Sequence, residues 1–215
     1  YGLRGIGALA PGYRADIVLL GDRETCAVES VLTAGVPLED AALAPARSVR
    51  YPNSVRAKPP SPEELRGPEG RVHVIGVESG KILTSRSIEN HDARGVAHLS
   101  VLERYGKKSP PANGYVRGFG SGFQGAIASS GGHDSHNLIA VGSSLQDMAL
   151  ALGAIIESGG GYSVAQNGSV KALLKLPLGG LMSPEPAEEI RKALKKMRFV
   201  CRNQGCELDE HFLQL

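Results

Sequence analysis

The stretch GAIASSGGHDSHNLIAVGSSLQDMALALGAII, residues 125–156, changes its apolar period from that of strands to that of a helix. Two short apolar runs, 125–129 and 138–141, flank a polar loop and are typical of buried strands. From Leu145 onward, apolar residues recur at steps of three and four, which predicts one apolar stripe on a helix with Ser144 as its N-cap. The stretch therefore predicts two strands followed by a helix.

Downstream of that helix the sequence predicts a hairpin and a second helix. Segments 162–166 and 169–176 flank an Asn-Gly dipeptide, which suits a type I′ turn because both of its central residues need positive φ. Ser183 is predicted as the N-cap of an amphipathic helix that ends at Gly205.

Upstream, residues 72–77 and 82–85 flank the turn-like ESGK and predict another hairpin. Two further strands are expected, at 98–102 and 115–119. Strands and helices interleave without strict βαβ alternation, so residues 71–215 are predicted to form an α/β or α+β layered domain with a mixed sheet.

A proline-rich segment separates this body from a short front piece. Six of the 13 prolines lie within residues 45–70, where no apolar period can be traced, and this segment is interpreted as a linker. Residues 1–44 contain two branched, strand-like runs, 16–20 and 28–33, but are too few for a comfortable core. Because the chain starts at tyrosine rather than methionine, we expect it to be a piece of a longer protein.

Composition and charge exclude several classes of protein. With 41% hydrophobic residues the chain is expected to be globular, and a net charge of +2 gives no reason to expect nucleic acid or an anionic membrane as a partner. No apolar run approaches the ~18 residues that span a bilayer, and the start does not resemble a signal peptide. A cytoplasmic location is the resulting expectation.

Cys26, Cys201 and Cys206 are odd in number and form no CxxC pair. This usage suggests neither a disulfide framework nor a thiolate zinc site. We interpret the three cysteines as reduced, packed thiols.

Five consecutive side chains that can form hydrogen bonds make up the polar loop His133-Asp134-Ser135-His136-Asn137. Two imidazoles three positions apart with a carboxylate between them can supply a base, an orienting group or metal ligands. The alternative is a tight turn in which Asp134 and Asn137 cap backbone amides. A metal site of its own is disfavoured because no second cluster of ligands is visible, and Ser135 lacks the GxSxG pattern of a nucleophile elbow.

Residues 120–125 formally fit the GxGxxG pattern of a dinucleotide site. A Rossmann fingerprint opens a helix of ten or more residues, whereas AIASSGG breaks within seven. A glycine loop that lets two backbones approach each other is the better interpretation.

Several segments together carry a resemblance to a known family. Residues 5–20, GIGALAPGYRADIVLL, resemble the segment that follows the barrel in metal-dependent amidohydrolases, where the chain returns to a small β-sandwich. The body is more specific, and it resembles the C-terminal region of bacterial adenine deaminases in VHVIGVESGKILT, VLERY, GYVRGFG, GAIASSGGHDSHNLIAVG, QDMALAL, LPLGGLMS and CELDEHFLQL. Where that family commonly has ERH, this chain has Glu103-Arg104-Tyr105.

The resemblance implies the C-terminal part of an enzyme of purine salvage that hydrolyses adenine to hypoxanthine and ammonia. It implies a divalent metal, manganese or iron, held by barrel histidines in the full-length enzyme, and no metal ligands or cofactor in this chain. We therefore expect the isolated chain to be inactive. A homo-oligomer is expected, with adenine as the small-molecule partner. The alternative is a non-catalytic binding or oligomerisation module that shares this domain.

Within that resemblance the polar loop is the candidate site. His133, Asp134 and His136 are the candidate catalytic residues, accessory to a barrel site, and Ser135 and Asn137 are the candidate substrate-binding residues. A purine is discriminated by a few fixed donors and acceptors, and this loop offers both kinds of group.

Overall fold

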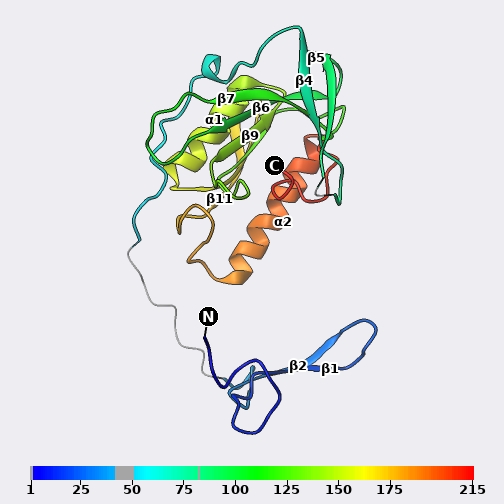
Figure 1. The fold of residues 1–215 in the computed structure, drawn as a ribbon, viewed down its shortest axis with the longest axis vertical. Helices are drawn as coiled ribbons and strands as arrows, with labels where there is room; N and C mark the ends of the chain where they lie inside the picture. Colours follow the sequence, from blue (N-terminus) through cyan, green and yellow to red (C-terminus); the bar gives the residue numbers. More distant parts are fainter. Residues whose placement is uncertain (1, 42–50, 82) are drawn as a thin grey trace. The chain divides into compact units, whose positions relative to one another are not determined.

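The computed structural model describes residues 2–41, 51–81 and 83–215, and the chain divides into two compact units, Tyr1–Ser48 and Val49–Leu215 (Figure 1). The division falls inside the proline-rich segment 45–70, which was interpreted as a linker. No helix in the described ranges is long and apolar enough to cross a bilayer.

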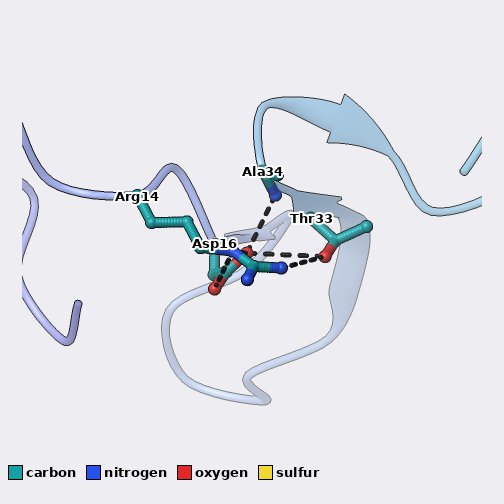
Figure 2. A network of polar contacts seen from close by, with 4 residues as sticks. All are labelled: Arg14, Asp16, Thr33 and Ala34. Carbon is teal, nitrogen blue, oxygen red and sulfur yellow. Dashed lines mark hydrogen bonds and ion pairs between the residues drawn. The ribbon is translucent and has the colours of Figure 1, made fainter. Parts of the chain in front are cut away.

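The first unit contains a small antiparallel sheet in the order β1-β2-β3. Its strands are β1 (Ile17–Leu20), β2 (Val28–Thr33) and β3 (Val36–Pro37). A polar network around Asp16 ties the sheet together (Figure 2): its carboxylate accepts hydrogen bonds from the Ala34 amide at 2.8 Å and from Arg14 Nε at 3.0 Å. The Ala34 amide is the main reason why the pKa of Asp16 is lowered.

The first unit has no core among its described residues. None of residues 2–41 is buried, and the strands leave apolar side chains such as Val18 and Val28 more than half exposed. This agrees with the expectation that so short a front piece cannot bury a core alone.

The second unit is a mixed eight-stranded sheet with two α-helices, as the sequence predicts. The strand order is β11-β10-β8-β9-β6-β7-β4-β5, and every neighbouring pair is antiparallel except β4 and β7, which are parallel. The strands are β4 (Arg71–Gly76), β5 (Ser85–Asn90), β6 (Val96–Leu102), β7 (Ala112–Arg117), β8 (Ala126–Ser129), β9 (Leu138–Gly142), β10 (Gly161–Gln166) and β11 (Ser169–Lys175). The helices are the 3-10 turn η1 (Glu63–Leu65), α1 (Leu145–Glu157) and α2 (Ala187–Asn203).

The two α-helices pack on opposite faces of the sheet. Because side chains alternate along a strand, Ile127 of β8 joins the cluster that contains Met197 and Cys201 of α2, whereas its neighbours Ala126 and Ala128 join the cluster built on α1. Small side chains on the α1 face let the helix lie close to the sheet. The apolar stripe predicted for each helix therefore packs on the sheet, α1 on one face and α2 on the other.

Several boundaries of strands and helices differ from the predictions. The strand expected at 82–85 is β5, which starts only at Ser85, while Ile82 lies outside the described residues. This edge strand carries a single large apolar residue, Ile88, so its sequence gives no apolar alternation to find. The β7 strand ends at Arg117 rather than Phe119, because Gly118 turns to φ +107°.

The second helix begins later than predicted. It starts at Ala187 after Pro186, whose extended ψ of 144° is not helical, and no side chain caps it. Ser183 instead accepts a hydrogen bond from the Glu185 amide at 3.2 Å, in the turn before the helix. The prediction of Ser183 as N-cap was wrong because Pro186 biases the preceding residue toward extended backbone and delays the first turn.

The Asn-Gly hairpin is confirmed. Asn167 and Gly168 have φ values of +53° and +72°, as a type I′ turn requires, and β10 pairs with β11 on either side of them. Part of the proline-rich segment belongs to the second unit, since Val55 and Leu65 are buried in the α1 cluster. Of the cysteines, Cys201 and Cys206 are buried, free thiols, and Cys26 is exposed.

Candidate functional site

The polar loop 133–137 joins β8 to β9, two neighbouring antiparallel strands at the centre of the sheet. Both strands are almost completely buried, so the loop leaves a rigid support. Two of its residues that are not glycine have left-handed backbone, Asp134 at φ +63° and His136 at φ +51°. Such conformations cost about 1 kcal/mol or more and gather at functional sites.

The first two side chains of the loop point into solvent. The side chains of His133 and Asp134 are 95% and 92% exposed, and His133 Nδ1 lies 3.3 Å from Asp134 Oδ1. At this exposure the pair contributes little to stability. The arrangement leaves an imidazole and a carboxylate together at the tip of the loop, where a second molecule or domain can reach them.

Of the remaining residues of the loop, Ser135 is still exposed, whereas His136 and Asn137 are partly buried. The Ser135 hydroxyl accepts a hydrogen bond from the Asn137 amide at 3.3 Å, and the His136 amide donates to the Gly132 carbonyl at 2.8 Å. Two buried side-chain atoms, His136 Nδ1 and Asn137 Oδ1, have no partner among the described residues. An imidazole nitrogen and an amide oxygen of this loop thus lie buried without a hydrogen bond from the described residues.

The side chains of the polar loop do not converge on a single binding point. Asp134 is paired with His133 alone, and neither Asp134 nor Asn137 caps a backbone amide with its side chain in the part of the chain that the structure describes. The Ser135 hydroxyl contacts a backbone amide and no imidazole there. These contacts support neither a nucleophile-base pair at Ser135 nor a turn held by Asp134 and Asn137.

The side chains present do not fit the metal that the family resemblance implies. Among residues 2–41, 51–81 and 83–215, no three His, Cys, Asp or Glu side chains come together as ligands of one ion. A protein metal site needs three or more such ligands.

Backbone atoms of other segments fill the space next to the glycines of the GxGxxG-like segment. A Cβ on Gly120 would lie 2.2 Å from the Gly205 carbonyl oxygen, and one on Gly125 would lie 2.4 Å from the Ala165 carbonyl oxygen. The interpretation of this loop as a close approach between backbones is confirmed, and no helix follows it before β8.

Sequence reasoning missed two residues beside the loop. Arg104 is 4% exposed although it is charged, and the hydroxyl of Tyr105 donates a 2.7 Å hydrogen bond to the Ser135 carbonyl. In the sequence, Tyr105 was noted only because it replaces the histidine of the family's common ERH triplet. A basic residue two positions after a partly buried strand is a weak signal, and nothing local in the sequence joins it to a loop 30 residues away.

Comparison with known proteins places the chain in a family. The profile described as "Adenine deaminase C-terminal domain" matches residues 75–215. The chain belongs to this adenine deaminase family. Over its whole length it is similar to adenine deaminases from Methylobacterium sp. (strain 4-46), at 45% identity, from Cereibacter sphaeroides (strain KD131), at 44%, and from Shewanella halifaxensis, at 39%.

The chain spans 39–40% of the length of these adenine deaminases. The resemblance seen in the sequence is therefore confirmed, and the chain corresponds to their C-terminal part.

Proposed function

We propose that this chain is the C-terminal part of an adenine deaminase, an enzyme that hydrolyses adenine to hypoxanthine and ammonia. The observation that carries the proposal is the similarity of all 215 residues to proteins named adenine deaminase, at up to 45% identity. The first unit supports it, because a small sheet without buried residues is stable only when something else covers its apolar side chains.

In this proposal the polar loop serves the substrate. His133, Asp134 and His136 position the purine or handle protons, and Ser135 and Asn137 hold it through hydrogen bonds. The support is the exposure of His133 and Asp134 on a strained loop, together with the unpartnered His136 and Asn137 atoms. Fixed donors and acceptors of this kind reject bases that leave them unpaired.

The metal belongs to the remainder of the enzyme. The relatives are about two and a half times as long as this chain, and residues outside the chain would hold the manganese or iron. Without such ligands the isolated chain is inactive. The enzyme acts in purine salvage in the cytoplasm and works as a homo-oligomer.

A chimaera tests the proposal. The C-terminal 40% of the Methylobacterium sp. (strain 4-46) enzyme is replaced by this chain, and ammonia release from adenine is measured with manganese supplied. We expect the chimaera to deaminate adenine, the 215-residue chain alone to be inactive, and the Methylobacterium remainder alone to be much weaker.

Two outcomes contradict the proposal. A folded, metal-loaded chimaera without activity would favour the alternative of a binding or oligomerisation module. Ammonia release by the isolated chain would show that its own residues suffice.

A further inference from the structure

Three segments that are far apart in the sequence reach the same end of the second unit's sheet. Leu102, the last residue of β6, pairs with Leu138, the first residue of β9, so residues 103–105 continue beside the polar loop. On the other side, Ser129 pairs with Tyr162, and Gly161 pairs with Lys175 at the end of β11. The Gly-Gly turn, residues 178–182, therefore follows at this same end, closed by a bridge between Leu178 and Met182.

Tyr105 connects the first of these segments to the polar loop. The residue is 44% exposed, yet its hydroxyl is fixed by donating to the Ser135 carbonyl at 2.7 Å. Ser135 lies between Asp134 and His136, the two residues with left-handed backbone. The bond thus restrains the loop at its strained centre.

Arg104 connects the same segment to the Gly-Gly turn. Its Nη2 donates to the Gly179 carbonyl at 2.9 Å, and its Cζ lies 5.2 Å from the centroid of the Tyr105 ring. Gly180, at φ +74°, has no room for a side chain, since a Cβ there would lie 2.1 Å from Arg104 Nη1. The Ser130 hydroxyl, just before the polar loop, donates to the Gly180 carbonyl at 2.5 Å.

Stability alone does not account for Arg104. In the described part of the chain, its Nε and Nη1 are buried without partners and no carboxylate forms an ion pair with it. A buried charge that is incompletely paired is usually less stable than an apolar residue of similar volume. What the guanidinium does provide is a rigid connection between the Gly-Gly turn and the Tyr105 ring.

We infer that Arg104 and Tyr105 are positioning residues that hold the polar loop and the Gly-Gly turn as one surface facing the substrate. The inference rests on the proposed function. Tyr105 fixes the loop directly through Ser135, and Arg104 fixes Tyr105 through its ring and the turn through Gly179. The candidate catalytic side chains His133 and His136 owe their placement to this pair.

Hydrogen exchange on the 215-residue chain tests the positioning without any activity. Tyr105→Phe removes only the hydroxyl, and we expect the His136 amide to exchange about fivefold faster, the factor typical of one lost hydrogen bond. The Leu181 and Met182 amides should keep their rates. Arg104→Lys should speed exchange in both the loop and the turn. Tyr13→Phe is the matched control, because Tyr13 is 45% exposed and its hydroxyl has no partner among the described residues.

Kinetics in the chimaera test the consequence. We expect Tyr105→Phe to lower kcat by ~10- to 100-fold, as small misplacements of reacting groups do, with KM and the melting temperature little changed.

The outcomes separate this inference from the proposed function. If the parent chimaera is inactive, the proposed function fails, and exchange still decides whether Tyr105 holds the loop. If the chimaera is active and Tyr105→Phe matches it in both exchange and kcat, the inference is wrong. It is also wrong if Tyr105→Phe speeds exchange throughout the second unit and lowers the melting temperature by several degrees, because the residue then only supports the fold.

Discussion

Gly120 shows how a single residue can be fixed by contact between backbones. Its φ is +117° and a Cβ would lie 2.2 Å from the Gly205 carbonyl oxygen, so Gly120→Ala should destabilise the protein by at least ~2 kcal/mol through strain and overlap. Gly122→Ala, in the same loop but in open space, should change stability by less than ~0.5 kcal/mol. Urea unfolding of both variants measures the difference, and equal effects would refute the contact.

His211 makes stability depend on pH. The residue is 1% exposed, and burial, ahead of the opposing hydrogen bond to Asp209, lowers its pKa below 6.5. The unfolded chain then binds the proton more readily, so stability should fall as the pH drops below about 6.5. The charged residues Arg198, Arg202 and Glu210 also act on this group. His211→Gln should lose less stability than the parent between pH 7 and 5.5 in urea titrations; parallel curves would contradict this.

At the scale of residues, only part of the candidate site could be predicted from the sequence. The residue types of the polar loop and its position between two strands could be predicted, because both are local properties of the sequence. The contact of Tyr105 with Ser135 and that of Arg104 with Gly179 could not, since they join residues 30 and 75 positions apart and depend on strand order.

Helix starts give a test at the scale of elements. The Ser144 hydroxyl accepts a hydrogen bond from the Asp147 amide at 3.2 Å at the start of α1, and Ser144→Ala should cost about 1 kcal/mol of stability. Ser183→Ala is the matched control, because Ser183 precedes α2 without capping it, and its cost should stay below ~0.5 kcal/mol. Equal losses of unfolding free energy in urea would contradict the assignment of Ser144, and not Ser183, as a helix N-cap.

Elements with a clear apolar period were predictable and the others were not. The two amphipathic helices and the β10–β11 hairpin were found because period and turn chemistry agree within each segment. The position of β5 was missed because a polar edge strand has little apolar surface to bury. The order of the eight strands, with its parallel pair β4–β7, is set by packing between distant segments and leaves no local trace.

At the scale of the whole molecule, the core of the described residues lies in the second unit. Every buried apolar side chain falls between Val55 and Leu208. A protein of residues 49–215 should therefore melt within ~3 °C of the whole chain, a shift that corresponds to about 1 kcal/mol. Calorimetry checks this, and loss of the cooperative transition on removing residues 1–48 would mean that the first unit contributes to the core.

The central claim is that the polar loop of this C-terminal domain serves the deamination of adenine. The most direct test is kcat/KM for adenine in the chimaera with His136→Ala, against His73→Ala on β4 as the control. We predict that His136→Ala lowers kcat/KM at least ~100-fold, about 2.7 kcal/mol, while metal content, melting temperature and the control stay near the parent. A lowered melting temperature with unchanged kcat/KM in the folded enzyme would contradict the claim.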